Sequence, residues 1–240
     1  MRTYVINLER SVQRKSYMEQ VLSKASGISY EFVKAADGSA LSEGEISKLF
    51  DRNKFYQRYG RHPRLGEIGC TLSHQYCYRQ MLKDAISMSL ILEDDIQIHD
   101  YDRFDETIAK LESFLSTESE PMVILLSSWF WYTGIYSVSE SLRLSKVYDA
   151  FSTYAYMLNA QAAKMLIENA PFITADDWRY IRKKGIKVYA LIPHLVDHKE
   201  VFESNIRDQM DKSPYWWRLC HFPHLLCKKL LEWSGHFEKP

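Results

Sequence analysis

The chain has 240 residues, of which 46% are hydrophobic, so it can form one domain of ordinary size around a substantial core. Its 31 basic and 31 acidic residues cancel, and nucleic-acid binding loses its main support because it depends on a basic surface. No apolar run reaches the length of a signal peptide or a membrane span.

The first three elements are expected to alternate between strand and helix. Residues 3–8 form a short apolar run that is typical of a buried strand, and residues 11–25 repeat apolar side chains near helical spacing. Residues 30–35 form a second strand candidate, which ends in the turn Asp37-Gly38. This order with tight connections predicts an α/β layer with parallel strands.

The middle of the chain continues the alternation. Residues 42–50 form a short helix candidate that opens with a capping box, whereas residues 51–65 lack a period and are expected to be a mobile loop. Further helices are expected at 67–85, 103–115, 160–169 and 174–184, further strands at 89–92, 122–126, 153–158 and 186–192, and irregular or hairpin structure at 129–147.

The last 29 residues differ in character. Residues 212–240 carry five Lys and Arg against two Glu, a net charge of plus three, among many Trp and Leu. Pro214 and Pro223 are expected to break any long helix there. We therefore divide the chain into a main domain, 1–211, and a basic aromatic tail, 212–240. The tail suits peripheral membrane contact, and packing back onto the domain is the alternative.

The compartment follows from several negative features. The four cysteines form no C-x-x-C pair, reduced cysteines are the simplest interpretation, and there is no Asn-x-Ser/Thr sequon. Together with the missing signal peptide, these features predict a cytoplasmic protein, which the tail could bring to the inner membrane.

The most informative motif is the acidic triplet Glu93-Asp94-Asp95, at the end of an apolar strand. Open α/β sheets bind ligands at the carboxyl ends of their strands, where three adjacent carboxylates repel one another. A divalent cation removes that repulsion, and nucleotide diphosphates need such a cation. An exposed acidic turn that caps the next helix explains the triplet alone equally well.

Two further motifs decide between these interpretations. The segment 64–74 reads Arg-Leu-Gly-Glu-Ile-Gly-Cys-Thr-Leu-Ser-His, and the chain opens with Val-Ile-Asn-Leu-Glu-Arg at 5–10. With the acidic triplet, these motifs resemble glycosyltransferase family 25 over roughly residues 3–206. That family contains bacterial lipooligosaccharide glycosyltransferases and is related to the collagen hydroxylysine galactosyltransferases. Three motifs in the same order make the resemblance specific.

The resemblance implies a fold and an activity. The fold would be α/β and GT-A-like, with a Rossmann-like mixed sheet flanked by helices. The activity would be inverting transfer from a UDP-sugar, often galactose, to a lipid-linked glycan acceptor, assisted by Mn²⁺ or Mg²⁺. Asp95 would chelate the ion, and Glu93 and Asp94 would contact ribose or support the ligands.

Other residues are assigned to the donor site by position or by the family motif. Guanidinium groups after the first strand could bind a diphosphate, and an acidic turn after the second strand could meet a ribose; a solvated helix face and a plain turn are the alternatives. The donor-binding candidates are Asn7, Leu8, Arg10, Arg14, Asp37, Gly66, Glu67, Ser73 and His74.

The catalytic base and a late metal ligand are placed by the family pattern. An inverting transferase needs a carboxylate that takes the acceptor proton, and Asp177 before Trp178 matches the pattern, with Asp176 as the second candidate. A capping box from Thr174 to Asp177 is the structural alternative. His198 could supply the late metal ligand, although the family more often has a glutamine-like residue nearby.

Two questions stay open from the residues alone. The basic segment with Arg58, Arg61, His62 and Arg64 could close over the donor, meet a phosphorylated acceptor or be merely solvated. One competing function is a metal-dependent nucleotidyl or phosphoryl transferase, but the sequence contains no Gly-x-x-x-x-Gly-Lys-Ser/Thr phosphate-binding loop. Another is a non-catalytic glycan-binding or membrane-scaffold protein.

Overall fold

The structure, a computed structural model, describes residues 1–199 and 215–239. Its helices are α1 (Val12–Leu22), α2 (Glu43–Leu49), α3 (Arg52–Tyr59), α4 (Leu65–Lys83), α5 (Tyr101–Thr117), α6 (Ala160–Ile167), α7 (Trp178–Lys183) and α8 (Tyr215–Trp233), with a 3₁₀ turn, η1, at Gly38–Ala40. Its strands are β1 (Arg2–Asn7), β2 (Ser29–Lys34), β3 (Met88–Glu93), β4 (Ile96–Ile98), β5 (Met122–Leu125), β6 (Phe130–Ser139), β7 (Leu142–Ala150), β8 (Ala155–Asn159), β9 (Lys187–Ile192), β10 (Val196–His198) and β11 (Phe237–Glu238).

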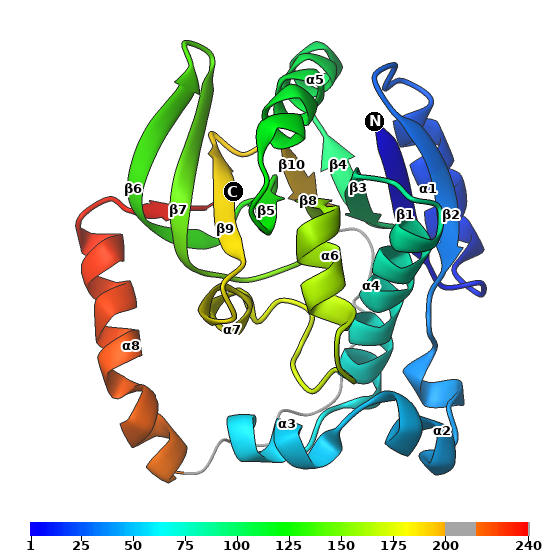
Figure 1. The fold of residues 1–240 in the computed structure, drawn as a ribbon, viewed down its shortest axis with the longest axis vertical. Coiled ribbons are helices and arrows are strands. Elements are labelled where there is room, and N and C mark those ends of the chain that lie inside the picture. The colour runs from blue at the N-terminus through cyan, green and yellow to red at the C-terminus, as the bar shows by residue number, and fades with distance from the viewer. Residues whose placement is uncertain (200–214, 240) are drawn as a thin grey trace.

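Nine of the described strands form one mixed sheet in the order β11-β6-β7-β9-β5-β8-β3-β1-β2. β1 pairs in parallel with both β2 and β3, so the carboxyl ends of these three strands meet at one edge. β8 runs antiparallel between β3 and β5, and β4 and β10 form a separate two-stranded ladder. Helices lie on both faces of the sheet, as Figure 1 shows. The expected mixed α/β sheet flanked by helices is confirmed.

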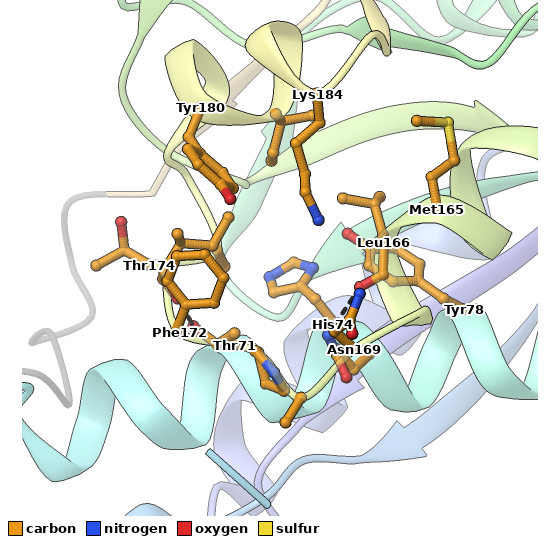
Figure 2. A pocket seen from close by; sticks show the side chains of 16 residues that line it. Thr71, His74, Tyr78, Met165, Leu166, Asn169, Phe172, Thr174, Tyr180 and Lys184 are labelled. Carbon is orange, nitrogen blue, oxygen red and sulfur yellow. Dashed lines mark hydrogen bonds between the residues drawn. The ribbon is translucent and has the colours of Figure 1, made fainter. Parts of the chain in front are cut away.

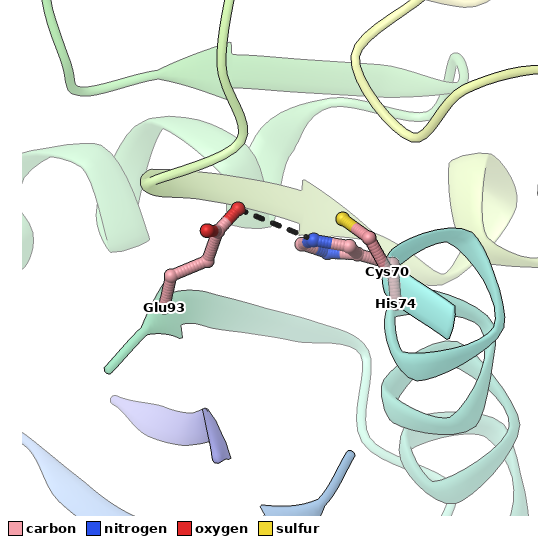
Figure 3. A group of neighbouring side chains, drawn as sticks. All are labelled: Cys70, His74 and Glu93. Carbon is pink, nitrogen blue, oxygen red and sulfur yellow. Dashed lines mark ion pairs between the residues drawn. The ribbon is translucent and has the colours of Figure 1, made fainter. Parts of the chain in front are cut away.

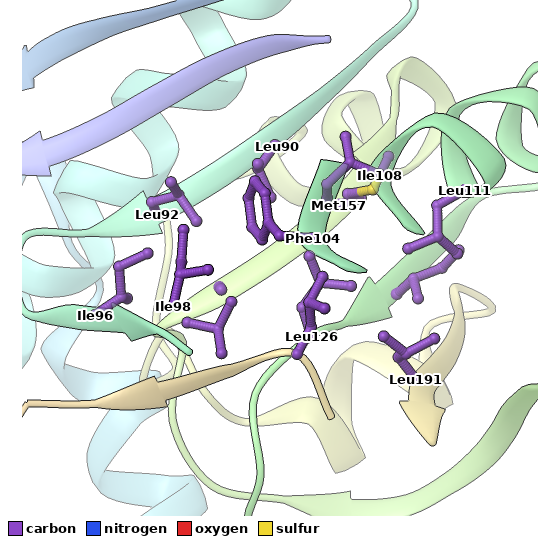
Figure 4. Packing of buried hydrophobic residues seen from close by; sticks show 14 of the residues in the cluster. Leu90, Leu92, Ile96, Ile98, Phe104, Ile108, Leu111, Leu126, Met157 and Leu191 are labelled. Atoms are coloured by element: carbon purple, nitrogen blue, oxygen red, sulfur yellow. The ribbon is translucent and has the colours of Figure 1, made fainter. Parts of the chain in front are cut away.

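Alternate residues of the central strands pack into two separate layers. Val5 and Leu92 face a cluster that contains residues of α1 and α5 (Figure 4), whereas Tyr4 and Ile91 face a cluster with residues of α4, α6 and α7. This is the period of two that a strand buried on both faces requires. Each fully buried large side chain contributes about 1.5–3 kcal/mol to folding. The buried residues of β1 and β3 thus anchor the strand ends that carry the acidic triplet.

The segment 51–65 is not the mobile loop that the missing period predicted. Arg52–Tyr59 form α3, with the Asp51 side chain accepting a hydrogen bond from the backbone of Lys54 and Gly60 ending the helix at φ 66°. Phe55 is fully buried against α2 and α4. A helix that buries one side chain among eight residues shows no apolar stripe. The only sequence features that indicate this helix are therefore the capping residues at its two ends.

Helix α7 is shorter than expected. It begins at Trp178, and the Asp177 side chain caps it by accepting from the backbone N–H of Tyr180. The predicted helix start at residue 174 is therefore wrong, because the capping residue is the Asp of the proposed capping box. Residues 129–147 do form a hairpin, β6 with β7.

The tail packs back onto the sheet where it is described. β11 pairs with β6, and Lys228 of α8 is 8% exposed and donates to Asp149 at 3.0 Å. Helix α8 continues through Pro223, contrary to the expected break, while Lys212, Pro214 and the side chain of Arg218 lie outside the described residues. None of the described helices is both long and apolar enough to cross a bilayer.

Candidate functional site

A cavity of about 780 Å³ opens at the carboxyl ends of β1, β2 and β3 and reaches the loops before β6 and β8. Its volume lies within the range of sites that hold a drug-sized ligand or a cofactor. Most residues predicted from the sequence line it: Leu8, Arg10, Arg14, Asp37, Gly66, Glu67, Ser73, His74, Glu93, Asp94, Asp95, Asp176 and His198. Asn7 and Asp177 are not among its lining residues.

The first strand and the acidic triplet are joined by direct hydrogen bonds. Asn7 donates to Asp94 at 2.6 Å, and one nitrogen of Arg14 donates to Asp94 at 2.8 Å and to Asp95 at 2.9 Å. Both aspartates are less than a tenth exposed. The parallel pairing of β1 with β3 brings these residues together, although about 80 positions separate them. Asn7 therefore holds the Asp94 carboxylate in place without itself lining the cavity.

Asp95 retains an unsatisfied acceptor. Its Oδ1 is buried without a hydrogen-bond partner, while its Oδ2 lies 3.5 Å from Nε2 of His198. Burial and the neighbouring Glu93 raise the pKa of Asp95 to about 7, and Arg14 only partly offsets them. Tyr154 stacks on the His198 ring at 4.8 Å and keeps it at this end of the cavity. A carboxylate and an imidazole so placed fit a divalent ion, because they supply the oxygen and nitrogen ligands that such ions accept.

Glu93 faces helix α4 across the cavity. Its Oε1 accepts from the hydroxyl of Thr153 and lies 3.5 Å from Nε2 of His74. Burial would raise the pKa of Glu93, but the neighbouring His74 ring and the Thr153 hydroxyl outweigh it and lower the pKa. The other His74 nitrogen, Nδ1, is 2.7 Å from the hydroxyl of Tyr156. Figure 3 shows Cys70 beside this pair, on the same helix as His74.

Gly69 in the α4 motif and Gly38 in the turn after β2 allow these two segments to approach closely. A Cβ atom on Gly69 would lie 2.6 Å from the Ala36 carbonyl oxygen, and one on Gly38 would lie 1.8 Å from the Leu65 carbonyl oxygen. Ser73 closes the same contact by accepting from the backbone N–H of Ala36 at 2.9 Å. The motif therefore presses α4 against the turn after β2, and Ser73 has a structural partner rather than a free hydroxyl.

Other motif residues are also engaged in local structure. Glu67 caps the start of α4 by accepting from the backbone of Arg64 at 2.9 Å, and it pairs with Arg61 at 2.6 Å. Asp37 caps η1 and pairs with Arg10, whose side chain is half exposed. Of the basic segment 58–64, Arg61 thus supports α4 instead of lying free in solvent.

The two aspartates proposed as the base differ in their surroundings. Asp177 caps α7 with one oxygen, while the other accepts from Arg58 at 2.5 Å and from the hydroxyl of Tyr59. Asp176 lines the cavity, where it accepts from the backbone N–H of Ser152 at 3.4 Å and interacts with the Thr174 side chain. Burial raises the pKa of Asp176 above its ordinary range.

The far wall of the cavity contains residues that the sequence did not reveal. Trp129 and Phe151 line it with 43% and 51% of their surface exposed. Trp129 and Ser152 have φ of 69° and 77°, a left-handed backbone that non-glycine residues rarely adopt and that often accompanies function. The Trp178 indole donates to the Ser152 carbonyl at 2.9 Å and helps to hold that strain. No local sequence pattern marks such positions.

A second pocket, between α4, α6 and α7, has a volume of only about 50 Å³. It shares His74, Thr174 and Ala175 with the large cavity, and Figure 2 shows the Lys184 side chain pointing into it. Its volume suffices for a few water molecules. It is too small for a nucleotide or a sugar, so the large cavity is the candidate functional site.

Comparison with known proteins agrees with these motifs. The profile of glycosyltransferase family 25 (LPS biosynthesis protein) matches residues 1–180. A glycosyltransferase 25 family member of Aedes aegypti is 29% identical over 70% of this chain and 28% of its own length. A candidate glycosyltransferase of Acanthamoeba polyphaga mimivirus is 28% identical over 90% of this chain and 69% of its own length.

Human procollagen galactosyltransferase 2 is 30% identical over 45% of this chain and 17% of its own length. The chain thus spans about a quarter of the insect relative and a sixth of the human one. Among solved structures, a glycosyltransferase involved in glycosylation of the major capsid of PBCV-1 is 9% identical with a TM-score of 0.44, over 84% of this chain and 93% of that one.

Proposed function

We propose that this chain, which belongs to glycosyltransferase family 25, is a glycosyltransferase that moves a sugar from a UDP-sugar to a glycan hydroxyl with inversion at C1. Galactose is the first donor to test, because one relative is named a galactosyltransferase. The observation that carries the proposal is the cavity of about 780 Å³ in which all three sequence motifs meet. Asp95 lines this cavity, and one of its carboxylate oxygens, Oδ1, is buried without a hydrogen-bond partner.

The proposed donor end lies at β1, β2 and β3. Arg14 already contacts two carboxylates there, and the exposed Arg10 beside Asp37 can reach a diphosphate and a ribose. Asp95 and His198 would hold Mn²⁺ or Mg²⁺, since Asp95 Oδ1 is unsatisfied and His198 is adjacent. Such an ion, when bound, neutralises the diphosphate and improves it as a leaving group.

We assign the general base to Asp176 rather than to Asp177. Asp176 lines the cavity and has no cationic partner among its contacts, whereas Asp177 lies outside the lining and its oxygens are occupied by Arg58, Tyr59 and the start of α7. Its raised pKa brings Asp176 closer to the pH at which a base works best. The acceptor hydroxyl would give its proton to Asp176 while its oxygen attacks C1. The C1–O bond to UDP breaks, and UDP keeps the electron pair.

The acceptor end is proposed at the opposite wall. Trp129 and Phe151 lie before β6 and after β7, across the cavity from the strands that carry the donor residues. Their exposed rings offer flat apolar surfaces to the face of a sugar. Asp176 approaches this wall, because it accepts from the backbone of Ser152 beside Phe151. A base at that position would meet the acceptor hydroxyl.

A lipid-linked acceptor is supported by the outer face of α8. Apolar side chains, all half exposed or more, recur there at helical spacing, away from the face that Lys228 fixes to the sheet: Phe222, Leu226, Leu230 and Trp233. Such a stripe with a terminal Trp suits the interface of a membrane. We propose that α8 contacts the membrane that carries the acceptor.

A donor panel tests the activity. The purified chain is incubated with single UDP-sugars and Mn²⁺, with and without oligosaccharide acceptors, and released UDP is measured. We expect one UDP-sugar to be consumed, with a large stimulation by the right acceptor and loss of activity with a chelator. Release of pyrophosphate, or no turnover of any UDP-sugar with any acceptor, would contradict the proposal.

A further inference from the structure

Three potential metal ligands lie together on the α4 side of the cavity, apart from the proposed Asp95–His198 pair. Cys70 and His74 are four positions apart and so share one face of α4, and Glu93 approaches them from the end of β3 (Figure 3). One ligand atom of each, Sγ, a ring nitrogen and a carboxylate oxygen, lies within 4.8 Å of the others.

The His74 ring supplies an independent observation. His74 is 2% exposed, and its Nε2 has no hydrogen-bond partner. Its Nδ1 is paired with Tyr156, whose hydroxyl also meets that of Tyr78 at 2.6 Å, so Nε2 is the ring atom left to face Cys70 and Glu93. Leaving a buried polar atom unpaired costs about 1–3 kcal/mol. A cation between Nε2 and the carboxylate would satisfy both.

We propose that Cys70, His74 and Glu93 form a binding site for Zn²⁺. A thiolate, an imidazole and a carboxylate are the ligands that zinc takes, and a tetrahedral ion with bonds of about 2.0–2.3 Å separates its ligands by roughly 3.3–3.8 Å. Atoms within 4.8 Å therefore need shifts on the order of 1 Å or less. The fourth position opens to the cavity, because all three residues line it.

The surroundings hold the ligands as a zinc site requires. Tyr156 orients the His74 ring through Nδ1, and the Thr153 hydroxyl holds the Glu93 carboxylate. Such supporting hydrogen bonds commonly change metal affinity by about 10–100-fold. The thiolate makes the site selective for a soft ion, whereas the oxygen-rich Asp95 end suits Mn²⁺ or Mg²⁺. One cavity would then hold two sites of different preference.

Zinc at this site would inhibit the proposed reaction. Glu93 belongs to the acidic triplet, so its coordination to zinc would withdraw it from the donor end and place a charged ion and its water within the cavity. This consequence depends on the proposed function, whereas zinc binding itself does not.

Cobalt provides a test of binding that needs no activity. Co²⁺ replaces Zn²⁺ in such sites, and a cobalt–thiolate bond gives an intense near-ultraviolet charge-transfer absorption. The full-length chain, freed of metal with a chelator, is titrated with Co²⁺ and then with Zn²⁺, without a sugar donor. The variants are Cys70→Ser and Cys70→Ala, with Cys77→Ser, Cys227→Ser and Asp95→Asn as controls; Cys77 is buried on α4 outside the cluster and Cys227 is exposed on α8.

We expect the absorption in the wild type and in all three controls, its displacement by Zn²⁺, and its loss in both Cys70 variants, with zinc affinity reduced on the order of 100-fold. Melting curves without metal identify any variant that fails to fold. Absence of the band from the wild type, or its persistence in a folded Cys70 variant, overturns the proposal.

A second arm concerns inhibition. In the Mn²⁺-supported transfer assay, micromolar Zn²⁺ should inhibit the wild type and the Cys77→Ser variant, and inhibit Cys70→Ser at least tenfold less. A positive cobalt titration with no transferase activity would count against the proposed function alone. Equal zinc inhibition of the wild type and Cys70→Ser would show that the inhibitory ion binds elsewhere.

Discussion

Arg14 donates a hydrogen bond to Asp95 at 2.9 Å, across 81 positions of the chain. This contact partly neutralises a carboxylate whose second oxygen is buried and unpaired. A divalent ion at this position would satisfy that oxygen and stabilise the ionised form of Asp95.

Asp95→Asn should stabilise the metal-free protein and abolish the thermal shift caused by Mn²⁺ with UDP. The pKa of Asp95 is raised to about 7, so its ionised form destabilises the fold at neutral pH. Wild-type stability should accordingly rise as pH falls from about 7 towards 4, because the folded state takes up the proton first. Melting temperature is the measurement, and each kcal/mol corresponds to about 2–4 °C. Asp102→Asn, on the exposed face of α5, is the matched control.

Asp176→Asn should reduce kcat by about 10²–10⁴-fold, the usual contribution of a general base, with little change in donor affinity. The wild-type rate should fall as pH drops through the raised pKa of Asp176, because only the ionised carboxylate accepts a proton, and this limb should vanish in the variant. Asp177→Asn is the comparison. It should retain activity within about tenfold and lower stability through loss of the Arg58 pair. A larger loss of kcat in Asp177→Asn would reverse the assignment.

Trp129→Ala and Phe151→Ala should raise the KM for the acceptor by roughly tenfold or more, since a buried aromatic contact contributes on the order of 1–2 kcal/mol. The dissociation constant of the donor, measured calorimetrically without acceptor, should stay within about twofold. Trp233→Ala is a matched control for a soluble acceptor, because Trp233 is 88% exposed on α8, outside the cavity lining. An unchanged acceptor KM in both cavity variants would exclude this wall as the acceptor site.

Gly69→Ala should destabilise the fold by about 1–3 kcal/mol, the usual cost of overpacking. The added Cβ would lie 2.6 Å from the Ala36 carbonyl oxygen, and neither backbone can move without separating α4 from the turn after β2. Gly44→Ala in α2 meets nothing within 4 Å and should instead be neutral or stabilising by up to about 1 kcal/mol through helix propensity. Urea unfolding of both variants measures the difference, and equal stability would refute the packing argument.

The pairing of β11 with the sheet should depend on pH. Glu238 lies 2.8 Å from His194 and raises its pKa, while His194 lowers the pKa of Glu238. The His194–Glu238 ion pair makes its full contribution to the stability of the fold below the ordinary histidine pKa of about 6.5, as long as Glu238 is ionised. This stabilisation is lost as pH rises through the raised pKa of His194, or falls through the lowered pKa of Glu238.

Hydrogen exchange measures this effect directly. The backbone N–H groups of Trp129 and Tyr132 donate to β11 and to its preceding residue, so their protection factors should fall between pH 6 and pH 8.5. Amides of β1, near the opposite edge of the sheet from β11, provide the internal control. His194→Gln should remove the pH dependence, and a slope that survives in this variant would point to another titrating group.

Sequence patterns revealed the parts of the site that depend on strand ends and spaced motifs. Asn7, Arg14 and Asp94 were predicted at one location because parallel strands bring their carboxyl ends together, and the hydrogen bonds agree. The roles of individual motif residues do not follow from their spacing. Glu67 and Ser73 satisfy backbone groups of the fold, which only the approach of α4 to its neighbours could reveal.

Other features could not be predicted because they depend on tertiary contacts. Trp129 and Phe151 reach the cavity through the pairing of β6 with β7, and their left-handed neighbour Ser152 is held by Trp178 from another element. Helix α3 escaped notice because only Phe55 is buried. Asp51 and Gly60, which cap this helix at its two ends, are the local sequence signals that indicate it.

The position of β8 between β3 and β5 has a consequence for biosynthesis. The central strands are synthesised in a different order from that in which they pair. β3 therefore gains its second neighbour only when residues 155–159 have been made, and the cavity wall is complete only after His198. A nascent chain on the ribosome therefore cannot complete the proposed donor site until nearly all of its described sheet has emerged. Donor binding at that site would report complete folding, and a donor analogue would stabilise only the finished molecule, by mass action.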